Sequence, residues 1–77
     1  MSIKAFIVNA YDKPVSNASV TFRWKTGGTT TVKTDINGFA DSGRQDTLVS
    51  IHSYGKTILD LGSKGQYFKE ATFKLKI

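Results

Sequence analysis

The sequence predicts an all-β protein, a small antiparallel β-sandwich of six or seven strands. Polar and apolar residues alternate with a period of two along most of the chain, and no stretch keeps a helical period for long. The alternating segments are rich in β-branched and aromatic residues, which pack well on a half-buried pleated surface. Turn-forming pairs such as Asn-Gly and Tyr-Gly interrupt these segments at short intervals. This pattern is typical of two stacked sheets with apolar inner faces.

The alternation and the turn signals together place six strands. They are expected at residues 3–10, 17–25, 29–35, 46–54, 56–61 and 67–77. No linker, repeat or low-complexity tract divides the 77 residues, so residues 1–77 are predicted to form one domain.

The first three strands are predicted from parity and from one tight turn. In "IKAFIVNA", alternate residues starting at Ile3 are expected to point into the core. In "ASVTFRWK", the expected core residues are Val20, Phe22 and Trp24. A hairpin at Gly27-Gly28 leads into the third strand, because glycine readily adopts the positive φ angles of a tight reversal.

The later strands are predicted in the same way. In "TLVSIHS", Val49 and Ile51 are expected on the core face, and Ser50 and His52 on the solvated face. The last segment, "ATFKLKI", alternates clearly between lysines and inward apolar residues, which are Phe73, Leu75 and Ile77.

Composition excludes several kinds of chemistry. The chain has no cysteine, which excludes disulfides, thiolate metal sites and a cysteine nucleophile. A single histidine, His52, excludes a multi-histidine metal site. The net charge is +5, but the basic residues are scattered, which favours a solvated lysine-rich surface over a nucleic-acid site. We therefore expect no metal and no cofactor.

The opening segment "MSIKAFIVNAYDK" does not have the features of a signal peptide. Its apolar run is short, alternates with polar residues and precedes no small-residue cleavage site. It is also far shorter than the roughly twenty residues that span a bilayer. We expect no membrane insertion and a cytoplasmic location, unless the chain is exported or virion-associated within a larger assembly.

The segment "KTDINGFADSG" combines a carboxylate, an amide and a glycine, which raises the question of a calcium loop. In an EF-hand frame that begins at Asp35, the fifth position is Phe39, which offers no ligand oxygen. As a turn, each residue has a role. Asp35 can accept hydrogen bonds from backbone amides two residues on, and Asn37-Gly38 tolerate left-handed φ. We predict a structural turn.

Catalysis is not expected. A Ser-His-Asp site would need His52 beside a poised serine, and Ser50 and Ser53 flank it in sequence. However, no strand-to-helix elbow is predicted to expose a serine nucleophile. We interpret His52 as a surface histidine and the chain as lacking catalytic residues.

Three segments in order resemble known families. "NAYDKPVSNASVTF", "KTDINGFA" and "DTLVSIHSYGK" are similar to bacterial Ig-like domains of the invasin and intimin type, and equally to carboxypeptidase-regulatory or transthyretin-like domains. The resemblance implies a Greek-key sandwich acting as a spacer, adhesive or docking unit in bacterial surface, spike, secretion or phage assemblies. One departure is Asp12, which stands where these families usually have a turn glycine.

A possible contact surface follows from the first strand. Its outward residues Phe6 and Val8 are apolar and lie beside Lys4, and Phe68 is expected to face outward as well. Exposed apolar neighbours often mark a contact surface, and on an edge strand they invite strand addition. The alternative is that another segment, such as "LGSKGQYF", covers them. Changing Phe6 and Val8 to threonine should leave the melting midpoint within a few degrees but weaken association with a partner or a second copy of the chain.

The leading hypothesis is a non-catalytic protein-interaction module that binds another protein, or a second copy of itself, through an edge strand. The alternative is a ligand-binding module for carbohydrate or nucleic acid. That function needs exposed aromatic rings for stacking, and Tyr11, Tyr54 and Tyr67 are the candidates.

Overall fold

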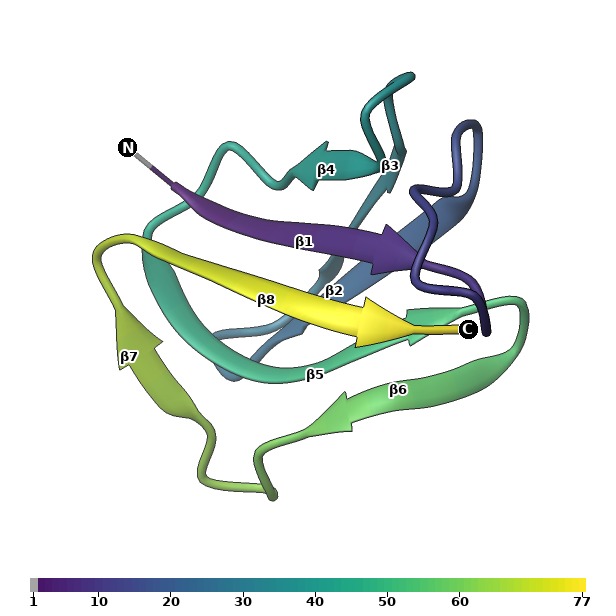
Figure 1. Ribbon diagram of the computed structural model, residues 1–77. Helices are drawn as coiled ribbons and strands as arrows, with labels where there is room; N and C mark the ends of the chain where they lie inside the picture. Colours follow the sequence, from purple (N-terminus) through teal and green to yellow (C-terminus); the bar gives the residue numbers. More distant parts are fainter. Residues whose placement is uncertain (1) are drawn as a thin grey trace.

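The computed structural model describes residues 2–77, which form an all-β, sandwich-like fold without helices. Two sheets lie face to face (Figure 1). The strands are β1 (Ile3–Val8), β2 (Ser19–Trp24), β3 (Thr29–Lys33), β4 (Phe39–Asp41), β5 (Asp46–Ser53), β6 (Lys56–Asp60), β7 (Gln66–Phe68) and β8 (Ala71–Lys76). Within residues 2–77 there is accordingly no helix of the length and apolarity needed to cross a membrane.

The two sheets differ in width. The first has the order β4-β1-β8, with β1 in the centre. The second has the order β3-β2-β5-β6, and β7 pairs with the first half of β5 where β6 pairs with the second half. The second sheet is therefore four strands across and the first is three.

The core consists of alternate residues of the central strands. Ile3, Ala5 and Ile7 of β1 face Val20, Phe22 and Trp24 of β2, as the alternation predicts, and all are buried. The Phe22 and Trp24 rings are stacked with centroids 6.0 Å apart. Full burial of a side chain such as Phe22 contributes about 2–3 kcal/mol. The Trp24 indole Nε1 donates a hydrogen bond to the Thr30 hydroxyl at 2.9 Å, so its polar atom is satisfied.

One strand pair differs from the predicted antiparallel sandwich. β1 and β8 run parallel, in a register that aligns Ile3 with Ala71 and Val8 with Lys76. The prediction of a wholly antiparallel arrangement is wrong for this pair. Alternation indicates which face a residue occupies, but it carries no information about strand direction.

The structure also has more strands than predicted. β4 was not expected, since a strand of three residues offers too little alternation to detect. The expected strand at 67–77 is in fact two strands, interrupted at Lys69 and Glu70, where the chain passes from the second sheet to the first.

A β-bulge moves Val49 away from the face expected for it. The register of β2 and β5 shifts so that Arg23 pairs with Ser50 and Trp24 with Leu48, which leaves Val49 as the extra residue. Leu48 and Ile51 are fully buried in the core, whereas Val49 lies on the outer face beside Ser50. The expectation that Val49 joins Ile51 in the core is wrong, because the bulge breaks the strict alternation.

Candidate functional site

The outer face of the first sheet carries part of the predicted contact surface. Phe6 is half-buried and its ring stacks on that of Phe39, with centroids 4.7 Å apart and planes 18° apart. The two residues are cross-strand neighbours on β1 and β4, and Lys4 is likewise paired with Asp41. Phe39 is 37 % exposed, so this aromatic pair is partly accessible. Phe39 is not predictable as a partner of Phe6 from the alternation, because β4 has only three residues.

Val8 also lies outside the core cluster, but solvent does not reach it. It is fully buried, and a β-bridge joins it to Pro14. The loop that carries Pro14 is held in place by Asn9, whose Oδ1 accepts hydrogen bonds from the amides of Tyr11 (2.8 Å) and Lys13 (3.1 Å). The expectation that Val8 is exposed is wrong, because this loop folds back over the end of β1.

Phe68 occupies a different part of the molecule. It lies on β7 in the second sheet, packs against the core cluster and meets Phe73 edge-on, with ring centroids 5.2 Å apart. The residues Lys4, Phe6, Val8 and Phe68 therefore do not form one continuous exposed surface.

β1 is not an edge strand. Its odd-numbered residues bond to the β4 side, since the Ile7 amide donates to the Gly38 carbonyl at 2.8 Å and the Val15 amide donates to the Ile7 carbonyl at 2.9 Å. Its even-numbered residues therefore bond to β8. β1 is thus paired on both sides, and the unpaired backbone groups of this sheet lie on its outer strands.

β8 is an edge strand with an unpaired side (Figure 1). The backbone amides of its odd-numbered residues point toward β1. Ala71 donates to the Ser2 carbonyl at 3.5 Å, and Ile77, directly after β8, donates to the Val8 carbonyl at 3.0 Å. The backbone groups of Thr72, Lys74 and Lys76 then point away from β1. Within residues 2–77 no strand pairs with that side. Lysines on a terminal strand are a sequence signal for such an edge.

A hollow of about 640 Å³ lies beside the end of this edge, between β8 and the β5–β6 hairpin. Its lining includes the apolar side chains of Tyr54, Ile58 and Ile77 and two lysines, Lys56 and Lys76, but no aspartate or glutamate. Tyr54 is 64 % exposed and Ile77 is 39 % exposed. These accessible apolar groups were not singled out as a cluster by the sequence, since they come from opposite sheets.

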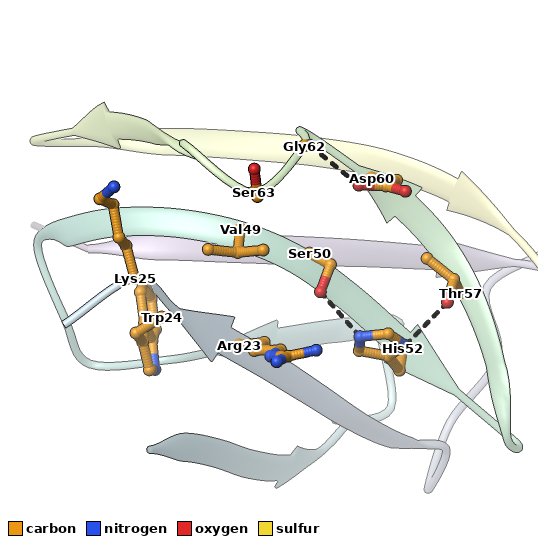
Figure 2. A pocket seen from close by; sticks show the side chains of 10 residues that line it. All are labelled: Arg23, Trp24, Lys25, Val49, Ser50, His52, Thr57, Asp60, Gly62 and Ser63. Atoms are coloured by element: carbon orange, nitrogen blue, oxygen red, sulfur yellow. Dashed lines mark hydrogen bonds between the residues drawn. The ribbon is translucent and has the colours of Figure 1, made fainter. Parts of the chain in front are cut away.

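A second hollow, of about 410 Å³, lies on the outer face of the second sheet (Figure 2). The Ser50 hydroxyl lies 2.7 Å from His52 Nε2, and the Thr57 hydroxyl lies 3.0 Å from His52 Nδ1. The remaining lining residues are Arg23, Trp24, Lys25, Val49, Asp60, Gly62 and Ser63. The bulge at Val49 and the loop after β6, whose Leu61 amide donates to the Val49 carbonyl at 2.8 Å, shape this hollow.

The Ser50–His52 contact has part of the geometry of a nucleophile and its base. Ser50 lines the hollow, but only 4 % of its surface is exposed, which restricts the access of a substrate carbonyl to its oxygen. The second ring nitrogen of His52 faces the Thr57 hydroxyl and not a carboxylate, which leaves the imidazole without the group that stabilises an imidazolium in a triad. This arrangement fixes the ring in place on the sheet.

Residues 35–39 form a tight turn. The Asp35 Oδ1 accepts hydrogen bonds from the amides of Asn37 (2.9 Å) and Phe39 (3.0 Å), and the Gly38 amide donates to the Asp35 carbonyl at 3.0 Å. Gly38 has a φ of 86°. Both lone-pair directions of this Asp35 oxygen are thus used by the turn itself. Among residues 2–77 there is no group of three or more acidic, histidine or cysteine side chains arranged to hold a metal ion.

Three aspartates have lowered pKa values. The Ser2 hydroxyl, followed by the Gly43 amide, lowers the pKa of Asp41. The Thr47 amide and then the Arg44 side chain lower the pKa of Asp46, and a hydrogen bond from Lys74 lowers that of Asp12. Each cause is a local hydrogen bond or ion pair, which stabilises the carboxylate without making it a general acid or base.

No family model, curated protein or solved structure matches this chain. Its likeness to Ig-like and transthyretin-like domains therefore depends on three short sequence segments.

Proposed function

We propose that the protein is a non-catalytic interaction module that binds an extended segment of another protein along β8. The observation that carries the proposal is the open edge: β8 is a strand of six residues whose Thr72, Lys74 and Lys76 backbone groups face no other strand in residues 2–77. An extended segment can satisfy such groups by adding one strand to the sheet.

The unequal widths of the sheets support strand addition at this place. The second sheet is one strand wider than the first. Apolar residues of β6 and β8, among them Ile58, Phe73 and Leu75, are only partly buried. A strand added to β8 would lie about 4.8 Å beyond it. It would extend the narrower sheet to four strands and cover part of this apolar row.

A second copy of the same chain is a poor occupant of this edge. In a symmetric antiparallel pairing of two β8 strands that aligns their three open residues, Lys74 stands opposite Lys74. A shift by two residues in one direction places Lys74 opposite Lys76. The opposite shift avoids lysine pairs only by placing Lys76 opposite Glu70, which lies outside β8. Like charges directly opposite each other destabilise a strand pair, so we assign the edge to a different protein.

We further infer a Greek-key sandwich of the Ig-like or transthyretin-like kind that serves as a docking or spacer unit in a bacterial or phage surface, spike or secretion assembly. Asp12 supports the resemblance behind this inference. Its φ is +65°, the left-handed conformation that a turn glycine would supply in those families. The turn at residues 35–39 occupies the second of the resembling segments.

A ligand-binding module for carbohydrate or nucleic acid is the second candidate. It is favoured by the exposure of Tyr11 (84 %), Tyr54 (64 %) and Tyr67 (61 %), which offer rings for stacking. These residues lie on separate segments: the loop after β1, the β5–β6 turn and β7. Binding to single-stranded DNA that weakens steeply with salt would favour the nucleic-acid form of this candidate, and absence of such binding would remove that form.

The edge can be tested by selecting random peptides from a phage-displayed library on the native protein. Selected peptides are then measured on Thr72→Pro, which removes an amide that points away from β1, and on Thr72→Val, which keeps it. We expect at least tenfold weaker binding to Thr72→Pro and unchanged binding to Thr72→Val.

Nuclear magnetic resonance on the native protein makes this test independent of how well the proline variant folds. Selected peptides should shift the amide signals of Thr72, Lys74 and Lys76 more than those of β3. Peptides that bind but shift other regions, or a library that yields no binder, would overturn the proposal.

A further inference from the structure

The chemistry around the β8 edge restricts the kind of segment that fits it. Lys74 and Lys76 are exposed, and their side chains share the outer face of the sheet because they are two residues apart on one strand. Lys74 forms an ion pair with Asp12 at 2.9 Å, and both side chains are about half-exposed. Lys76 forms no ion pair within residues 2–77. Asp12 also lies near enough to Lys76 for the lysine charge to lower the pKa of its carboxyl, so one carboxylate faces two ammonium groups and the edge presents net positive charge.

The hollow at the end of β8 is also lined by positively charged and not by acidic side chains. Lys56 and Lys76 line it together with no aspartate or glutamate, while Tyr54, Ile58 and Ile77 supply apolar surface. An apolar side chain that enters it would be covered on both sides, by the β5–β6 hairpin and by the end of β8. An acidic neighbour on that segment would meet the two ammonium groups.

We propose that the occupant of the β8 edge is an acidic extended segment in which carboxylate and apolar residues alternate. Its carboxylates lie on the outer face against Lys74 and Lys76, and its apolar residues face inward toward the β6 side. One of the apolar residues anchors in the hollow between Tyr54 and Ile77. This inference rests on the proposed function, since it assumes strand addition at β8, and it adds the chemistry of the partner.

A single extended segment can present carboxylates on its outer face and apolar residues on its inner face, because its side chains alternate between the two faces. Successive side chains of an added strand point to opposite faces, so acidic residues at every second position all meet the lysine face while the others all turn inward. Opposite-charge pairs across neighbouring strands strengthen pairing by roughly two- to fivefold each. Two such pairs give an expected preference of about tenfold for an acidic segment over a neutral one.

Blocked synthetic peptides provide the probe. One peptide of eight residues alternates glutamate with valine, and two counterparts replace glutamate with threonine or with lysine. A fourth peptide has the glutamate–valine composition with the two residue types in separate blocks. We expect the alternating glutamate peptide to bind about tenfold more tightly than the threonine peptide at moderate salt, with still weaker binding of the lysine and block peptides.

Charge reversal on the protein tests the location. Lys76→Glu should weaken binding of the glutamate peptide about tenfold and strengthen that of the lysine peptide. Lys33→Glu is the matched control, because it makes the same change of net charge on the exposed edge of β3. It should alter neither affinity by more than about twofold. Equal effects of the two variants would show long-range attraction to net charge and overturn the inference.

Removal of the aromatic wall tests the hollow. Tyr54→Asn keeps a residue suited to the turn but removes the ring, and Tyr11→Asn is the control on another exposed loop. We expect several-fold weaker binding for the first variant alone. If the threonine peptide binds as tightly as the glutamate peptide and still shifts the amides of Thr72–Lys76, the acidic preference is wrong and strand addition stands. If no peptide shifts those amides, the proposed function fails as well.

Discussion

Gly38 lies directly against Ile7: a Cβ atom on Gly38 would stand 2.8 Å from the Ile7 carbonyl oxygen. The same atom would come within 3.1 Å of the Pro14 Cβ and 3.3 Å of the Phe6 ring. The Gly38 carbonyl in turn accepts the Ile7 amide at 2.8 Å. The turn before β4 is thus seated on β1, close to the partly exposed Phe6–Phe39 pair.

Gly38→Ala should destabilise the fold by about 2–4 kcal/mol, because positive φ and a backbone clash act together. Gly43→Ala is the matched control, since Gly43 also has a positive φ of 69° but nothing lies within 4 Å of its virtual Cβ. That variant should lose only about 1 kcal/mol. Urea unfolding of the two variants measures the difference, and equal losses would contradict the role of the Ile7 contact.

Val8→Thr should lower the free energy of unfolding by about 1–3 kcal/mol, since it buries a hydroxyl beneath the Pro14 loop. Phe6→Thr should lose the stacking with Phe39 and about 1 kcal/mol or more. The expectation from the sequence that these substitutions leave the melting midpoint within a few degrees does not fit the burial of Val8 or the stacking of Phe6 on Phe39. Thermal unfolding of the single variants checks it; a midpoint unchanged in Val8→Thr would mean that the loop opens readily.

Tyr54→Asn should raise the free energy of unfolding by about 0.5–1 kcal/mol. Tyr54 has a φ of +52° and Gly55 a φ of +73°, so both residues of this two-residue hairpin turn are left-handed. Asparagine before glycine suits such a turn better than tyrosine does. Chemical denaturation gives the measurement, with Tyr67→Asn as a comparison on β7. A loss of stability in Tyr54→Asn would show that the exposed ring packs favourably in solution.

Stability should fall at acidic pH. Asp12, Asp41 and Asp46 have folded-state pKa values below the ordinary 3.8. Their contribution is therefore fully present above pH of about 4, and it is lost as the pH falls through the lowered values. Urea unfolding at pH 7, 4 and 2.5 follows this loss.

Asp41→Asn separates one part of this pH dependence from the rest. Because the Ser2 hydroxyl and the Gly43 amide stabilise the charged form of Asp41, the variant should show a smaller drop in stability between pH 4 and 2.5 than the native protein. Asp35→Asn offers no such comparison, since it disrupts the turn. An identical drop in Asp41→Asn and the native protein would assign the pH dependence to the other aspartates.

Much of the core could be predicted from the sequence because burial in a sheet follows local alternation. The positions of Val20, Phe22 and Trp24 depend only on which residues share a face, and a period of two specifies that. The tight geometry at Asn37-Gly38 is similarly local. Its hydrogen bonds join residues no more than four positions apart.

Tertiary structure decides which segments contact each face of a strand and which segments shield it from solvent. The loop that contains Pro14 buries Val8. Phe39, which stacks on Phe6, lies on a strand too short to be predicted from alternation. A β-bulge places the Val49 side chain on the outer face and not in the core. The open edge depends on β8 pairing in parallel with β1, from the other end of the chain. Alternation assigns each side chain to a face, but contacts between distant segments decide which backbone groups and side chains remain accessible.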